Sequence, residues 1–231
     1  MSYSIKIPRE FYNKGERIFD KGTLTFEPGI TVLIGCNGSG KSTILRHIKD
    51  HCRREDIPVL YYDNFTEGGN NAKSKAMSIG NMKYLQESMI SSEGENINLN
   101  FGYFISKVGK YVRGNILPDP DNVLVDAVYG IVNERKKLFI LCDAIDSGLS
   151  IDYILQIKDV FHLIIDDCKN DADLYIIVSA NEYELARKEN CFNVVKCRYE
   201  DIHDYETYRK VIINTRKRKQ KRYGFEEFNY D

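Results

Sequence analysis

The sequence has no apolar run long enough to cross a membrane, no C-x-x-C pair and almost no net charge. Its longest apolar runs, such as "LFILC" and "YIIV", are far shorter than the ~20 residues that a transmembrane helix needs. The formal net charge of -1 gives no overall attraction to nucleic acid or to an anionic membrane. The first ten residues, "MSYSIKIPRE", contain no apolar signal-peptide core, so we expect a cytoplasmic protein without a membrane partner.

The six cysteines are scattered and have no histidines nearby at zinc-site spacing. We therefore interpret them as small reduced residues, buried or at the surface, rather than as disulfide or metal ligands. The 231 residues are 42% hydrophobic and 29% charged, which is typical of an ordinary globular protein. This length fits one large domain, or one domain with a small appendage.

Short apolar runs alternate with helical patterns along the chain. The run "GITVLIG" at 29–35 is typical of a strand buried on both faces, and Ile44, Leu45 and Ile48 then fall on one side of a helix. The pattern predicts further strands at 3–7, 23–27, 59–62, 138–142, 174–178 and, more weakly, 192–195, and helices at 74–91, 97–108, 124–132 and 154–164. Such alternation predicts an α/β fold with a mainly parallel sheet flanked by helices.

The stretch "GCNGSGKST" at 35–43 satisfies the phosphate-loop pattern G-x-x-x-x-G-K-[ST] and lies between a predicted strand and a predicted helix. Its glycines permit backbone angles and close approaches that a side chain would block, so backbone N–H groups can face phosphate oxygens. A glycine-rich turn that contains Lys-Ser by coincidence is the alternative. The predicted ATP-binding residues here are Gly35, Cys36, Asn37, Gly38, Ser39, Gly40, Lys41, Ser42 and Thr43, with the Ser42 hydroxyl also a Mg²⁺ ligand.

A second site residue follows the apolar strand in "LFILCDAIDSGLS" at 138–150. Asp143 ends this strand, where a carboxylate can meet Mg²⁺ through a water molecule. The alternative is an aspartate that caps a helix after the strand. The phosphate loop elsewhere in the chain favours the metal site.

Together these segments resemble an ABC-type ATPase domain, in particular the soluble branch that includes the SMC, Rad50 and RecF heads. The resemblance covers roughly Phe11 to Ala186, and further segments agree with it in order: "YYDNF", "SSEGE", "DAIDSGLS" and "IIVSANEYELA". It implies a P-loop NTPase fold with a short helical subdomain. We expect an ATP-binding domain over 1–200, its signature-containing helical part at about 72–135, and a C-terminal helix with a basic tail at 201–231.

The resemblance also implies a homodimer in which each ATP lies between the phosphate loop of one subunit and the signature loop of the other. The signature residues would be Ser92, Glu93, Gly94 and Glu95, although a polar N-cap box before the 97–108 helix is an equal alternative. Tyr12 matches the aromatic residue that stacks on adenine, with a buried strand tyrosine as the alternative. Asn64 takes the place of the Q-loop glutamine. Only 51 positions separate Lys41 from Ser92, which favours a compact ATPase over a transporter subunit.

Two departures from the family pattern predict slow hydrolysis. Ala144 stands where a glutamate would polarise the attacking water, and alanine cannot accept a proton. Asn181 stands where a histidine would contact the γ-phosphate. Asp146 is a possible substitute carboxylate. We expect an ATP-dependent switch or slow ATPase in DNA transactions, phage biology or defence, or else a non-catalytic module that uses nucleotide to present a surface to a protein partner.

The stretch "RKRKQKR" from Arg216 to Arg222 carries six cations in seven residues. Such a strip can contact phosphates of a nucleic acid, with an affinity that falls steeply with salt. The favoured alternative is a solvated helix end, because cations are stabilised near the C-terminal end of the helix dipole.

Overall fold

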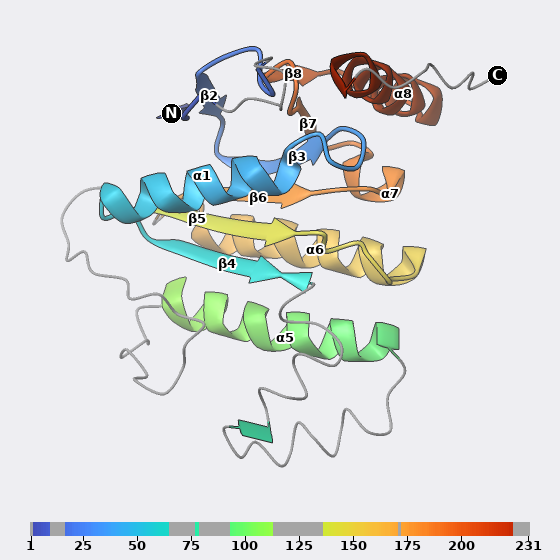
Figure 1. Cartoon of the computed structure of the whole chain (residues 1–231). Helices are drawn as coiled ribbons and strands as arrows, with labels where there is room; N and C mark the ends of the chain where they lie inside the picture. Colours follow the sequence, from blue (N-terminus) through green and yellow to red (C-terminus); the bar gives the residue numbers. More distant parts are fainter. Residues whose placement is uncertain are drawn as a thin grey trace.

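The computed structural model describes residues 2–9, 17–64, 77–78, 93–112, 136–170 and 172–223. Its central sheet contains β3 (Gly29–Ile34), β4 (Val59–Asp63), β5 (Lys136–Asp143), β6 (Ala172–Ser179), β7 (Asn190–Asn193) and β8 (Arg198–Glu200). A smaller antiparallel sheet pairs β1 (Tyr3–Lys6) with β2 (Thr23–Phe26). The helices are α1 (Lys41–Arg54), α5 (Glu93–Val112), α6 (Ile151–Cys168), α7 (Tyr183–Ala186) and α8 (Tyr205–Tyr223) (Figure 1).

The strands of the central sheet have the order β4-β5-β6-β3-β7-β8, and every neighbouring pair is parallel except β7 and β8. Strand β6 lies between β3 and β5, so that Ile176 is the register partner of both Ile30 and Ile140. Because parallel strands share one direction, the carboxyl ends of β3, β5 and β6 meet at one edge of the sheet. The chain therefore has the mainly parallel α/β fold predicted from the sequence.

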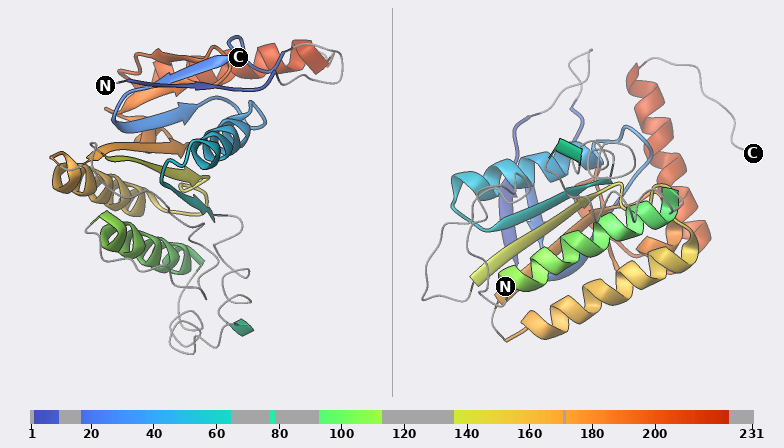
Figure 2. Two further views of the ribbon diagram at one scale, coloured as in Figure 1. Left: turned by 90° about the vertical axis from the view of Figure 1, so that its left-hand side faces the viewer. Right: turned by 90° about the horizontal axis from the view of Figure 1, so that it is seen from below.

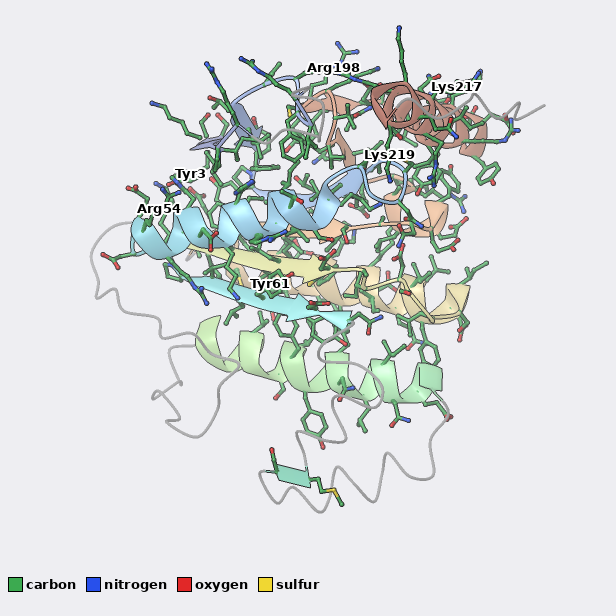
Figure 3. All side chains as sticks on the ribbon, viewed as in Figure 1. Tyr3, Arg54, Tyr61, Arg198, Lys217 and Lys219 are labelled. Atoms are coloured by element: carbon green, nitrogen blue, oxygen red, sulfur yellow. The ribbon has the colours of Figure 1, made fainter. Side chains whose placement is uncertain are left out.

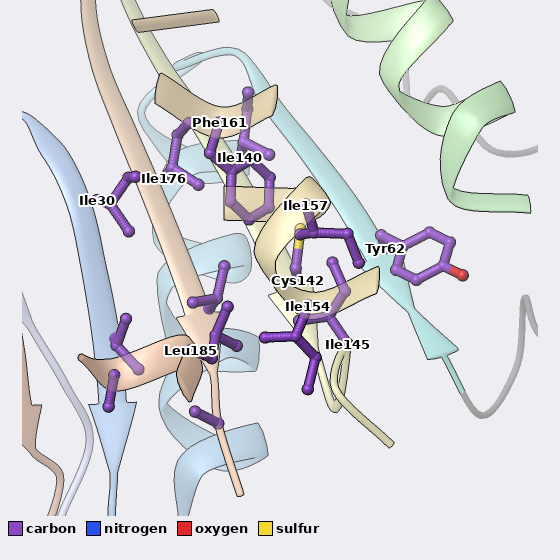
Figure 4. Close-up of a cluster of buried hydrophobic side chains, with 14 of the residues drawn as sticks. Ile30, Tyr62, Ile140, Cys142, Ile145, Ile154, Ile157, Phe161, Ile176 and Leu185 are labelled. Atoms are coloured by element: carbon purple, nitrogen blue, oxygen red, sulfur yellow. The ribbon is translucent and has the colours of Figure 1, made fainter. Parts of the chain in front are cut away.

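Helices cover both faces of the sheet (Figure 2), with α1 on one side and α6 on the other. Alternate residues of β5 face different cores: Ile140 and Cys142 belong to the cluster with α5 and α6, while Phe139 and Leu141 pack with α1. Figure 4 shows part of the first cluster, in which residues of α6 such as Ile157 lie against β5 and β6. This two-sided burial explains the continuous apolar runs of the central strands.

Several predicted elements have different bounds in the structure. Helix α5 begins at Glu93, four residues before the predicted start, and α6 extends the predicted 154–164 helix in both directions. Strand β8 was not predicted; it is only three residues long and pairs antiparallel with β7. The helix predicted at 124–132 and nearly all of the one at 74–91 lie outside the described residues. The domain boundaries stay predictions.

The structure also bears on the cysteines and on membrane-spanning helices. All six cysteines are buried and none of them forms a disulfide, as expected for small reduced residues. Within the described part of the chain, no helix is both long and apolar enough to span a bilayer.

Candidate functional site

The phosphate loop connects β3 to α1 at the carboxyl edge of the sheet. Its glycines are required by close contacts as well as by backbone angles. At Gly35 a Cβ atom would lie 2.6 Å from Ser39 Oγ, and at Gly40 (φ +101°) it would lie 2.8 Å from the Phe19 ring. The loop is closed by a hydrogen bond from Ser39 N–H to Cys36 O (3.0 Å), and α1 begins with Ile44 N–H donating to Gly40 O (2.9 Å).

Lys41 is the buried cation of this loop, with 8% of its surface exposed. Its Nζ donates to Gly35 O at 2.8 Å, which holds the ammonium group across the mouth of the loop. Burial lowers the pKa of Lys41, whereas the nearby Asp146 and Asp143 carboxylates oppose this shift. Asn37, Gly38 and Ser42 are exposed, while Thr43 is half-buried. An anion that enters the loop would therefore meet a cation already oriented by the protein.

Asp143 lies at the carboxyl end of β5 and is 6% exposed. Its Oδ1 accepts a hydrogen bond from Ser179 Oγ (2.6 Å), and Ser179 Oγ accepts one from Ala144 N–H (2.7 Å). The N-cap of the following helix α6 is Ser150, so Asp143 does not cap it. The alternative of a helix-capping aspartate is therefore wrong. Ser179, at the end of β6, orients this carboxylate and was missed from the sequence, because its partner is 36 residues away.

The carboxylate and hydroxyl groups at this edge suit Mg²⁺, which prefers oxygen ligands and is commonly held by one or two carboxylates together with phosphates of the nucleotide. Asp143 and Ser42 would supply such oxygens. The described residues contain no cluster of three or more His, Cys, Asp or Glu side chains that could hold a metal ion without the nucleotide. The oxygens of Asp143 and Ser42 fit a magnesium ion that is held together with phosphate oxygens.

Ala144 adopts a left-handed backbone conformation with φ +50°, which is uncommon for a residue with a side chain. Its peptide groups are held on both sides, since its N–H bonds to Ser179 and its carbonyl accepts from Asn64 Nδ2 at 3.1 Å. Asn64 Nδ2 also donates to Ser147 O at 2.8 Å, whereas Asn64 Oδ1 is buried without a hydrogen-bond partner. The structure thus places Asn64 beside the turn that contains Ala144.

Asp146 links this turn to the end of β6. Its Oδ2 accepts hydrogen bonds from the N–H groups of Asn181 (2.6 Å) and Glu182 (2.7 Å), and the residue is 3% exposed. Burial raises the pKa of Asp146, against the lowering effect of these two hydrogen bonds. The Asn181 side chain is exposed, and its carbonyl accepts from Tyr208 Oη of α8 at 2.9 Å. Two separate contacts, Ser179 with Ala144 and Asp146 with Asn181, therefore tie the turn after β5 to the end of β6.

The predicted signature residues lie at the start of α5. Glu93, Gly94 and Glu95 belong to the first turn of this helix, and Ser92 lies outside the described residues. Helix α5 begins at Glu93, four residues earlier than expected, and because Ser92 lies outside the described residues neither the signature loop nor the N-cap box is tested. Tyr12, the predicted adenine-stacking residue, also lies outside the described residues, so neither of its interpretations is tested.

The basic residues 216–222 belong to the last turns of α8, which ends at Tyr223. Arg218 forms an ion pair with Asp20, and Lys219 Nζ donates to Asn37 O of the phosphate loop at 3.0 Å. Lys217 and Lys221, in contrast, are exposed. The cations thus lie at a helix end, as the favoured interpretation has it, and Arg218 and Lys219 in addition contact Asp20 and the phosphate loop. Nucleic-acid binding by Arg216–Arg222 stays a prediction.

A pocket lies next to the phosphate loop and was also missed from the sequence. Three cations and one aromatic ring contribute to its lining, which is formed by Pro8, Arg9, Arg17, Phe19, Lys21 and Gly22. The Phe19 ring connects the pocket to the loop through its close approach to Gly40. The three cations of the pocket come from the segment before β2.

Comparison with known proteins supports the assignment of the loop. Residues 14–52 match a family model described as an AAA domain. Among the solved structures, CbiO1 from Clostridium perfringens, described as part of the ABC transporter complex CbiONQ, is similar with 13% identity and a TM-score of 0.47 over 96% of both chains. Among curated proteins, none matches. The chain thus has an α/β fold with a mainly parallel sheet, and its residues 14–52, which contain the complete phosphate loop, match the AAA domain model.

Proposed function

We propose that the protein binds ATP with Mg²⁺ and acts as a nucleotide-dependent switch with weak hydrolysis. One observation carries this proposal: Lys41 begins α1 just after β3, and Asp143 ends β5, so that both lie at the carboxyl edge of the sheet, with Ser42 following Lys41. Phosphate oxygens would bind the loop N–H groups and the Lys41 ammonium group. Asp143, oriented by Ser179, and Ser42 would hold the magnesium ion, which neutralises phosphate charge when bound.

Weak hydrolysis follows from the side chains around the reacting phosphate. Ala144 has no group that can orient or deprotonate water. Asn181 can donate a hydrogen bond but carries no charge. Asp146 retains a carboxylate, yet one of its oxygens is already bound by two backbone N–H groups. The same geometry is compatible with a second function, a nucleotide-binding module that presents a surface to a protein partner without turnover.

We further propose that two copies of the chain close on the nucleotide. The exposed Asn37, Gly38 and Ser42 leave part of the phosphate loop open, so a second surface can cover it. Gly94 lies in the first turn of α5, and the N–H groups of a first helical turn have no partners within the helix and can bind an anion. With Ser92 just before it, this turn would complete the partner's site.

A mass measurement of the protein with and without ATP·Mg²⁺ tests this arrangement. We expect ATP to raise the dimer fraction, Lys41→Ala to prevent this by removing nucleotide binding, and Ser92→Arg to prevent it while ATP still binds the monomer. A stable dimer without nucleotide that is unaffected by Ser92→Arg contradicts the shared site.

A further inference from the structure

Helix α8 is attached to the phosphate loop through contacts that no sequence motif predicts. Thr215 is 4% exposed, and its Oγ1 accepts the Cys36 N–H of the loop at 2.9 Å. One turn later the ion pair between Arg218 and Asp20 fixes α8 to the segment before β2. Together with the contact of Tyr208 to Asn181, these bonds place α8 along the carboxyl edge of β3 and β6.

The Lys219 ammonium group lies on the phosphate loop itself. Its Nζ donates to Asn37 O at 3.0 Å, and a Cβ atom on Gly38 would lie only 2.2 Å from this nitrogen. Gly38 has φ +73°, so the absence of a side chain serves both the backbone angle and the approach of the lysine. Figure 3 shows Lys219 on the side of α8 that faces the loop, whereas Lys217 lies on the outer side of the helix.

We propose that Lys219 is a second phosphate-binding lysine of the nucleotide site, supplied by α8 in addition to Lys41 of the loop. The inference rests on the proposed ATP binding. A phosphate oxygen bound by the Gly38 N–H would lie within roughly 8 Å of Lys219 Nζ, given the close approach above and ordinary bond and hydrogen-bond lengths. The flexible four-carbon stem of lysine permits a shorter distance after a small rotation.

The charge of Lys219 at this distance from a phosphate is sufficient to change the affinity for ATP. With an effective dielectric constant of about 20, the attraction between two unit charges at that separation corresponds to roughly tenfold or more in the dissociation constant. Arg216, half-buried on the same helix, adds positive charge close enough to act on Lys41. The predicted metal ligand Asp143 and its neighbour Asp146 bring negative charge to the same edge, so additional cations offset repulsion of the phosphates.

The experiment measures ATP·Mg²⁺ affinity by calorimetric titration of the full chain. Lys219→Gln removes the charge and keeps a donor for Asn37 O; Lys219→Arg keeps the charge; Lys217→Gln is the matched control on the exposed side of α8. We expect Lys219→Gln to weaken ATP binding about tenfold, Lys219→Arg to stay within about threefold and Lys217→Gln within about twofold of the unchanged chain.

The melting temperature without nucleotide shows whether each variant is folded, and Lys219→Met replaces the glutamine variant if that one does not fold. Equal affinities for Lys219→Gln and Lys217→Gln overturn the proposal. So does an equal loss for Lys219→Arg and Lys219→Gln, because the role would then be one of shape and not of charge. If the folded, unchanged chain and Lys217→Gln bind no ATP at all, the proposed function itself fails, which is a distinct result.

Discussion

Replacing Ala144 with glutamate is expected to raise ATP turnover at least about tenfold above the barely detectable rate of the unchanged chain. A positioned general base typically contributes about 10²- to 10⁴-fold, so even an imperfectly placed glutamate should be measurable. The left-handed backbone of Ala144 does not oppose the change, because alanine already has the Cβ atom that makes φ +50° unfavourable. Steady-state phosphate release at saturating ATP measures the effect.

The matched control is Ala144→Gln, which introduces a side chain of nearly the same size that cannot accept a proton. It should leave turnover at the level of the unchanged chain. Brisk hydrolysis by the unchanged chain, indifferent to Ala144→Glu and lost in Asp146→Ala, would show that Asp146 is the base. If neither the unchanged chain nor the Ala144→Glu variant hydrolyses ATP while both bind it, the non-catalytic module becomes the better description.

Asp146→Ala is expected to lower the free energy of unfolding by about 3 kcal/mol, since it removes two hydrogen bonds to a buried carboxyl oxygen. The N–H groups of Asn181 and Glu182 would lose the oxygen that now ties the end of β6 to the turn after β5. Denaturant unfolding measures the change. Asp146→Asn keeps an oxygen for both donors and should cost much less.

The difference in stability between the unchanged chain and Asp146→Asn should depend on pH. Burial raises the pKa of Asp146 above its ordinary value of 3.8, so the folded state binds this proton more tightly than the unfolded state does. Its stabilising contribution is then complete below 3.8 and is lost as the pH rises through the folded-state pKa. The unchanged chain should therefore lose stability relative to Asp146→Asn over this range. A constant difference, or equal stability of the alanine and asparagine variants, contradicts the role given to Asp146.

Local sequence carries the signals for the phosphate loop and for Asp143. The phosphate loop lies within nine consecutive residues, and the buried strand before Asp143 has an apolar pattern that ends at the site. These signals require no knowledge of distant contacts. The mainly parallel sheet likewise follows from alternating strand and helix patterns, whereas the order in which β6 lies between β3 and β5 does not.

The parts that were missed depend on contacts between distant segments. Lys219 and Asn37 are 182 residues apart, and Ser179 reaches Asp143 from a neighbouring strand. In the sequence, the cations of α8 fit a helix end. Their spacing does not indicate that Lys219 packs on the phosphate loop. Similarly, the tie between Asp146 and Asn181 needs the adjacency of β5 and β6, which is a property of the sheet.

Nucleotide binding at the phosphate loop is the central claim, and thermal unfolding with and without millimolar ATP·Mg²⁺ tests it most directly. ATP at a hundred times its dissociation constant should stabilise the fold by about 2.7 kcal/mol, which is a clear rise in melting temperature. Lys41→Ala should abolish the rise, because it removes the buried cation of the phosphate loop. An unchanged melting temperature of the intact chain with ATP·Mg²⁺, or an equal rise in Lys41→Ala, would contradict the account.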